Sequence, residues 1–180
     1  MDLTERKIEE KEIYNGKIMH VFCDTVQLPN GQTAKREYMR HVGAVCIVPL
    51  NEKNEILMER QFRYALGRVV LEIPAGKLND PHEDRLLAAQ RELREETGIT
   101  AQKWDSLGLF FPACAYSDEK IEMFLAREPV FGAQQLDEDE FLDLEWIALP
   151  TLTDMVMRGE ITDAKTQTAI LKTKLFLERE

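Results

Sequence analysis

Three glutamates near the middle of the chain, Glu92, Glu95 and Glu96, have the spacing of a metal site. Side chains three and four residues apart lie on one face of an α-helix, so these carboxylates can converge on one point. Hard cations such as Mg²⁺ prefer oxygen ligands of this kind. Stacked acids repel one another, so helix stability alone does not account for them. The competing interpretation is a solvated acidic helix face, with Arg91 and Arg94 as partners.

The residues around these glutamates predict the helix that carries them. Apolar residues recur at helical spacing and form a stripe: Leu86, Ala89 and Leu93. Gly98 stands where a helix normally ends in a left-handed residue. Two starts are compatible with the sequence, a capping box at residues 80–83 or a loop end one turn later at Glu83-Asp84.

The rest of the chain alternates strand and helix patterns. Asn30-Gly31 is a strong signal for a tight turn between two strands. The predicted strands are residues 19–28, 33–41, 44–50, 55–62, 69–73, 107–111, 120–126 and 142–147, and the predicted later helices are residues 151–158 and 163–177. This order favours a mixed sheet that is covered on two sides.

Composition narrows the class of protein. The chain has 180 residues, 44% of them hydrophobic, which is enough for the core of one domain. A formal net charge of −10 argues against a nucleic-acid partner, because phosphate binding needs a basic surface. No stretch has the length and apolarity of a membrane span. The three cysteines, Cys23, Cys46 and Cys114, lack metal-ligand spacing and suit a reducing compartment, so we expect a cytoplasmic protein.

The glutamate segment resembles the Nudix box, whose pattern is Gly, five residues, Glu, seven residues, Arg-Glu-apolar-x-Glu-Glu-x-Gly-apolar. The matching residues are Glu83, Arg91, Glu92, Leu93, Glu95, Glu96, Gly98 and Ile99. One departure is that six residues, not five, separate Gly76 from Glu83. The extra residue falls in a loop, where insertions cost little.

The flanking segments are similar to the ADP-ribose pyrophosphatase branch of that superfamily. These segments are residues 59–63, 71–76, 116–119 and 161–166. The resemblance implies an α/β/α sandwich with a mixed sheet and an N-terminal strand extension. We expect residues 1–40 to form the extension, as a possible dimerisation element, and residues 41–180 to form the Nudix hydrolase domain. It also implies a homodimer that hydrolyses nucleoside diphosphate sugars to a nucleoside monophosphate and a sugar phosphate.

The same resemblance assigns roles to the acidic residues. It implies Mg²⁺ as the cofactor, with Mn²⁺ as a substitute, bound by Glu92 and Glu96, by Glu95 as a shared ligand and by the carbonyl of Ala75. The general base in this branch comes from a loop after the box. Glu140 matches best, and Glu138 is second.

Several other charged residues are assigned roles as well. Arg63 is the best phosphate partner, because a guanidinium binds two oxygens at once. Arg36 is a second candidate, with an outward-facing hairpin residue as its plainer interpretation. We expect Arg91 to orient a glutamate and Glu83 to brace the loop against the helix, with helix capping as the plainer role of Glu83.

Two alternative functions stay open, a different substrate and a role without catalysis. The branch commonly has a Ser-Pro-Gly segment where this chain has Ala113-Cys114-Ala115, and Tyr116 lies close to where a tyrosine marks diadenosine polyphosphate hydrolases. Ser117-Asp118-Glu119 nevertheless follows the sugar-nucleotide pattern. The other alternative is a non-catalytic Nudix module that senses such a ligand. Regulators of that kind usually carry a basic DNA-binding domain and often lose box glutamates, and this chain has neither feature.

Overall fold

The computed structural model describes residues 1–136 and 141–179. Contacts divide these residues into two compact units. The first unit consists of residues 1–43 and 111–120, and the second of residues 44–110 and 121–180. No helix in the described part of the chain is long and apolar enough to cross a lipid bilayer.

The first unit is a small antiparallel sheet. Its strands are β1 (Arg6–Glu9), β2 (Glu12–Asn15), β3 (His20–Gln27) and β4 (Thr33–Arg40). Strand β3 is central, because β1 and β2 pair with one of its edges and β4 with the other. Gly31 has φ +83°, as the predicted tight turn between β3 and β4 requires. Of the apolar side chains in this unit, Phe22 and Val26 are the ones that are buried.

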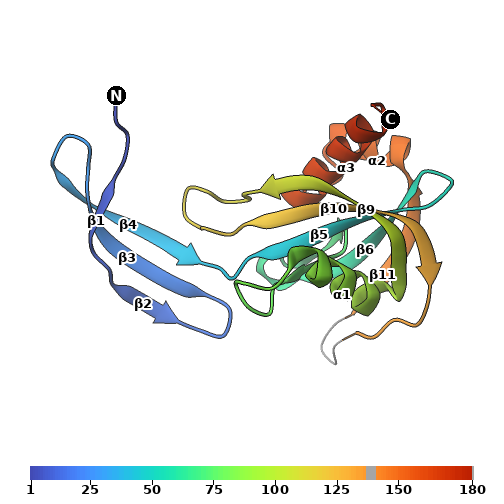
Figure 1. Ribbon diagram of the computed structural model, residues 1–180, viewed down its shortest axis with the longest axis horizontal. Coiled ribbons are helices and arrows are strands. Elements are labelled where there is room, and N and C mark those ends of the chain that lie inside the picture. The colour runs from blue at the N-terminus through green and yellow to red at the C-terminus, as the bar shows by residue number, and fades with distance from the viewer. Residues whose placement is uncertain (137–140, 180) are drawn as a thin grey trace. The chain divides into compact units, whose positions relative to one another are not determined.

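The second unit contains a mixed seven-stranded sheet (Figure 1). Its strands are β5 (Ala44–Leu50), β6 (Glu55–Arg63), β7 (Arg68–Glu72), β8 (Ala75–Lys77), β9 (Ile99–Phe110), β10 (Ile121–Phe131) and β11 (Leu142–Ala148). The order is β11-β6-β5-β10-β9, with β7 paired to β6 and β8 paired to β5. Only the β5–β10 pair is parallel among the described strands. Every residue of β5 is buried, as expected for a strand covered on both faces.

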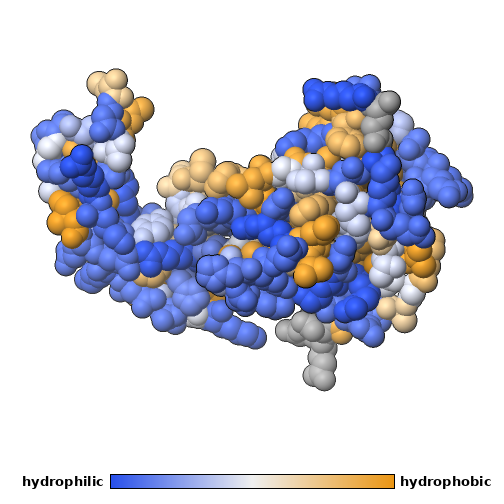
Figure 2. Space-filling view, viewed as in Figure 1, coloured by the Kyte–Doolittle hydropathy of each residue, from blue (hydrophilic) through white to orange (hydrophobic). Residues whose placement is uncertain are grey.

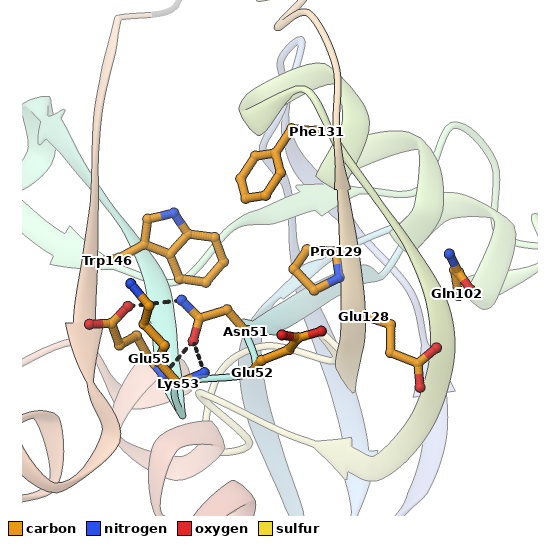
Figure 3. Close-up of a pocket in the computed structure, with 9 residues that line it drawn as sticks. All are labelled: Asn51, Glu52, Lys53, Glu55, Gln102, Glu128, Pro129, Phe131 and Trp146. Carbon is orange, nitrogen blue, oxygen red and sulfur yellow. Dashed lines mark hydrogen bonds between the residues drawn. The ribbon is translucent and has the colours of Figure 1, made fainter.

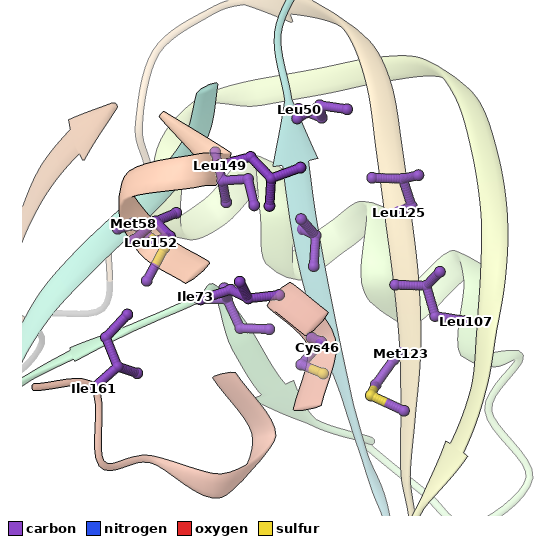
Figure 4. Close-up of a cluster of buried hydrophobic side chains, with 14 of the residues drawn as sticks. Cys46, Leu50, Met58, Ile73, Leu107, Met123, Leu125, Leu149, Leu152 and Ile161 are labelled. Atoms are coloured by element: carbon purple, nitrogen blue, oxygen red, sulfur yellow. The ribbon is translucent and has the colours of Figure 1, made fainter. Parts of the chain in front are cut away.

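Helices cover both faces of this sheet, which gives three layers (Figure 1). Helix α1 (Arg85–Thr97) packs on one face, where its buried residues Ala89 and Leu93 join a cluster with Val45 and Ile47. Helices α2 (Leu149–Met157) and α3 (Ala164–Leu177) cover the other face. The larger apolar cluster lies there and includes the residues labelled in Figure 4.

The structure decides the start of α1 and confirms its end. Asp84 is the N-cap, and its side chain accepts a hydrogen bond from Leu87 N at 3.0 Å. The later of the two predicted starts is therefore correct. Gly98 ends the helix in the left-handed conformation, with φ +71°.

Several elements extend beyond their predicted bounds. Strand β9 begins at Ile99 instead of residue 107, β10 extends to Phe131 instead of residue 126, and α2 begins at Leu149. Strand β9 is an edge strand with many exposed residues, so its first half lacks the apolar run used to predict strands.

Candidate active site

The predicted metal-binding glutamates lie where α1 faces the short strand β8. Glu96 is 5% exposed, and its Oε2 accepts a hydrogen bond from Ala75 N at 3.1 Å. The Glu92 carboxylate lies directly against Gly76, where an added Cβ would stand 1.9 Å from Glu92 Cδ. Gly76 is therefore required for space, and the two carboxylates rest on the main chain at Ala75 and Gly76.

Arg91 holds two of the glutamates together. Its Nη1 donates to Glu92 Oε1 at 2.7 Å and to Glu95 Oε2 at 3.1 Å. One nitrogen atom thus lies between the two carboxylates. Burial would lower the pKa of Arg91, but the attraction of Glu92 and the other nearby carboxylates raises it above its ordinary value. The two hydrogen bonds agree with the expectation that Arg91 orients a glutamate.

The loop between β8 and α1 is fastened to the same arginine. Glu83 Oε1 accepts a hydrogen bond from Arg91 Nη2 at 3.4 Å, and Glu83 also accepts from the main-chain N–H of Asn79. Arg91 Nη2 contacts the carbonyl of Lys77 at 3.3 Å as well. Glu83 therefore braces the loop, as expected, and the extra residue is accommodated between residues 77 and 83.

The last turn of α1 supports the chain that leads to the predicted general base. Gln135 N donates to the carbonyl of Glu95 at 2.9 Å, and the Gln134 side chain bonds the carbonyl of Glu96. Gly98 is needed here for space as well as for its φ, because a Cβ would lie 2.7 Å from Gln134 N. Glu140 and Glu138 themselves lie outside the described residues.

Arg63 lies at the end of β6 and is held by Glu72 of β7. Its Nε and Nη2 donate to the two Glu72 oxygens at 2.7 and 2.9 Å, a bidentate pair. Arg63 also borders a cavity together with Asp163 and Lys165 at the start of α3.

Arg36 belongs to the first unit and has a different environment. It lies on β4 and forms an ion pair with Glu5, with its side chain 46% exposed. This is compatible with the plainer interpretation of an outward-facing hairpin residue, and its role in substrate binding stays a prediction.

Two charged residues beside Arg63, the buried Glu72 and the partly buried Lys165, received no role from the sequence. Glu72 is 2% exposed, and Lys165 of α3 forms an ion pair with it. The available signal was the charged residue inside an apolar strand segment, Leu71-Glu72-Ile73, because an acid is rarely buried without a charged partner.

A separate cavity of about 690 Å³ lies at the other end of β5, beside the turn that leads to β6. Figure 3 shows that Trp146 and Phe131 face into it, and their ring centroids are 6.3 Å apart. None of the predicted catalytic, metal-binding or phosphate-binding residues is among those that line it. The cavity is therefore distinct from the glutamate site.

A three-layer α/β/α unit with a glutamate helix set against a glycine is the arrangement expected of a Nudix protein, and sequence comparison agrees. The NUDIX domain family matches residues 39–166, and the family described as nucleoside diphosphate sugar hydrolase N-terminal domain matches residues 5–39. The chain therefore belongs to the Nudix family.

Individual relatives are similar along most of the chain. An ADP-ribose pyrophosphatase from Bacillus subtilis (strain 168) is 39% identical, covering 93% of this chain and 91% of that protein. A methanol dehydrogenase activator from Bacillus methanolicus is 38% identical, covering 92% and 90%. A crystal structure of an ADP compounds hydrolase covers 99% of this chain and 97% of that one, with a TM-score of 0.87 and 21% identity, so it supports the fold alone.

Nudix hydrolases generally need a divalent cation, and the donor set here fits one. Carboxylate oxygens are suitable ligands for a hard cation. The main-chain N–H of Ala75 bonds Glu96, and Gly76 leaves room for the Glu92 carboxylate. Among the described residues, no three acidic, histidine or cysteine side chains yet converge in a complete ligand cluster. Arg91 Nη1 lies between Glu92 and Glu95, which shows that a positive charge is accommodated there.

Proposed function

We propose that this chain hydrolyses the diphosphate bond of ADP-ribose, or of a related nucleoside diphosphate sugar, to a nucleoside monophosphate and a sugar phosphate. The observation that carries the proposal is the packing of the Glu92 carboxylate on Gly76 and of Glu96 on the Ala75 N–H, in a Nudix box. Full-length similarity to a protein named ADP-ribose pyrophosphatase supports this substrate class.

Mg²⁺ is the proposed cofactor, with Mn²⁺ as a substitute. Glu92 and Glu96 would be its principal ligands, with Glu95 shared and the carbonyl of Ala75 as a further ligand. A divalent ion supplies charge neutralisation on the diphosphate and lowers the pKa of bound water. The chain contributes the orientation of these carboxylates, because Arg91 bonds Glu92 and Glu95 and Gly76 leaves room for Glu92.

The remaining roles belong to residues that act on substrate or water. Arg63 would clamp the diphosphate, since the Nη1 side of its guanidinium makes no hydrogen bond to any described residue. Glu140 is the proposed general base, with Glu138 second, because the preceding segment is fastened to the last turn of α1 through Gln135. Arg36 is the second proposed substrate-binding residue.

A homodimer is the proposed assembly, formed through the first unit, the N-terminal strands. A four-stranded sheet with so little buried apolar surface is marginal by itself. Several large apolar side chains of this unit are more than half exposed, including Ile8, Ile13 and Ile18. Figure 2 shows apolar side chains at the surface of this unit. A second copy of the chain would cover them.

We expect the protein to have twice the 20.8 kDa mass of one chain in analytical ultracentrifugation at micromolar concentration. Changing Ile13→Asp and Ile18→Asp together should weaken the dimer, because burying charge at an apolar interface is unfavourable. Met157→Asp, at an exposed position on α2, is the control and should leave the mass unchanged. A monomeric wild-type protein would refute the dimer.

The proposed location is the cytoplasm. Cys23, Cys46 and Cys114 are all free thiols, which suits a reducing compartment. Burial raises the pKa of Cys46 to about 12, so this thiol is unreactive.

The proposed function is tested by comparing kcat/KM for ADP-ribose with kcat/KM for diadenosine polyphosphates. We expect ADP-ribose or another nucleoside diphosphate sugar to have the higher value, with a monophosphate and a sugar phosphate as products. Tyr116→Ala should then change either value less than about threefold, because no second base is stacked on this ring.

The opposite outcome defines the second candidate function. Tyr116 is 62% exposed, so its ring is available for stacking on a base. If dinucleotides are preferred and Tyr116→Ala removes that preference, the protein is a diadenosine polyphosphate hydrolase, since stacking contributes about 1–3 kcal/mol per base. Absence of hydrolysis of any such compound would favour a ligand-sensing module.

A further inference from the structure

Lys165 carries an enclosed positive charge at the start of α3. Its side chain is 12% exposed and lies between two carboxylates, Glu72 and Asp163. The distance from Lys165 Nζ to Asp163 Oδ2 is 3.0 Å. Burial would lower the pKa of Lys165, but the attraction of Asp163 and Glu72 raises it above its ordinary value. The ammonium group therefore stays charged.

Glu72 connects this lysine to the proposed phosphate clamp. One of its oxygens contacts both Lys165 Nζ and Arg63 Nη2, and the other accepts from Arg63 Nε. Burial raises the pKa of Glu72, but Arg63 and Lys165 outweigh it and lower the pKa. Two cations and two carboxylates thus alternate in one chain of contacts, from Arg63 through Glu72 and Lys165 to Asp163.

Local structure at the start of α3 supports the Lys165–Asp163 end of this series of contacts. Asp163 is the N-cap of α3 and accepts from Thr166 N at 2.9 Å. Thr166 Oγ1 in turn accepts from Ile73 N at 3.1 Å, which fastens the helix start to the residue after Glu72. These bonds hold the backbone at the start of α3, and so the Cα of Lys165, close to Glu72.

Removing the lysine charge would leave two carboxylates to share the remaining cation. Arg63 already experiences the attraction of Asp163 as well as that of Glu72. A cavity of about 480 Å³ bordered by Arg63, Glu72, Asp163 and Lys165 gives the guanidinium room to move toward Asp163. The bidentate pair with Glu72 would then open.

We propose that Lys165 is a positioning residue that balances Glu72 and Asp163, so that the Arg63 guanidinium stays in the bidentate pair and presents its Nη1 side to the diphosphate. This inference rests on the proposed function, in which Arg63 binds the substrate. Lys165 itself acts through Arg63.

Kinetics with ADP-ribose test the proposal. Lys165→Met is expected to raise KM about tenfold, with a smaller change in kcat, as for loss of a binding contact. Lys165→Arg restores the charge and should recover most of this loss. Lys174→Met, at an exposed position on the same helix, is the control and should match the wild type. If Lys165→Met does not fold, Lys165→Gln carries the same expectation.

A double-mutant cycle separates positioning from plain stability. In an Arg63→Ala background, Lys165→Met should change kcat/KM less than about twofold further, because the residue through which it acts is gone. An equal fold-loss in both backgrounds would overturn the proposal, since the lysine would then act independently of Arg63.

A measurement without substrate distinguishes this inference from the proposed function. The Arg63 Nε–H resonance in an NMR spectrum, assigned by its loss in Arg63→Ala, should be shifted by the bond to Glu72 in the wild type. We expect that shift to disappear in Lys165→Met and to persist in Lys165→Arg. An unchanged Nε–H signal in Lys165→Met would refute the positioning role, whether or not the protein hydrolyses ADP-ribose.

Discussion

Replacing Glu96 with glutamine is expected to lower kcat by at least about a hundredfold at saturating Mg²⁺, because a neutral amide is a poor ligand for a hard cation. The fold should survive, since glutamine keeps an oxygen that can accept the hydrogen bond from Ala75 N. Glu92→Gln should have a similar effect. Steady-state kinetics and thermal unfolding of the same samples measure both quantities.

Glu160→Gln is the matched control for these variants. Glu160 is an exposed acid paired with Arg158 after α2, so its loss of charge should leave kcat unchanged. Near-normal turnover of Glu96→Gln would show that this carboxylate does not bind the catalytic ion. A collapse of thermal stability in both glutamine variants would contradict the expectation that the fold survives.

Gly76→Ala should abolish most of the activity with little change in stability. The new Cβ would lie 1.9 Å from Glu92 Cδ and about as close to both carboxylate oxygens, so the carboxylate has to leave its place. The atoms that must move are at the end of a flexible side chain, which makes the clash cheap for the fold. We expect kcat/KM to fall at least about a hundredfold, as for loss of a catalytic group.

Gly159→Ala is the contrasting variant. Gly159 has φ +74° and open space around it, so alanine there is strained by about 1 kcal/mol without contacting the glutamates. Thermal unfolding should show the larger loss of stability in Gly159→Ala, and kinetics the larger loss of activity in Gly76→Ala. Equal losses of activity in the two variants would mean that Gly76 matters only for folding.

Local signals in the sequence were sufficient for the glutamate helix and its ends. The i, i+3, i+4 spacing of the glutamates placed them on one face, and Gly98 marked the end of α1. The start was ambiguous because Asp80 and Asp84 are both suitable caps. The structure selects Asp84 because Glu83 is engaged with Asn79 and Arg91 in the loop.

Strand lengths were predicted less well where burial is one-sided. In β9 only Ile99 and Leu107 are buried, and its first half offered no apolar run. Its partner β10 supplies the pairing along almost the whole length, from Ile121↔Phe110 to Phe131↔Ile99. Such pairing depends on a strand distant in sequence, which a local pattern does not contain.

Local sequence patterns could not predict the parts of the site that depend on contacts between residues far apart in the chain. Arg63 could be proposed as a phosphate partner from its type and family resemblance, but its pairing with Glu72 needs the β6–β7 register. The partnership of Glu72 with Lys165 joins two different layers of the sandwich. No spacing rule relates these residues, so only the folded chain reveals it.

The fastening of β7 to the last helix has a consequence for how the protein is made. Thr166 and Lys165 bond to Ile73 and Glu72, which precede them by 93 positions. On the ribosome, β7 is synthesised long before these partners exist. Translation therefore delays the contacts of Glu72 with Lys165 and of Ile73 with Thr166 until residues 165 and 166 have left the exit tunnel.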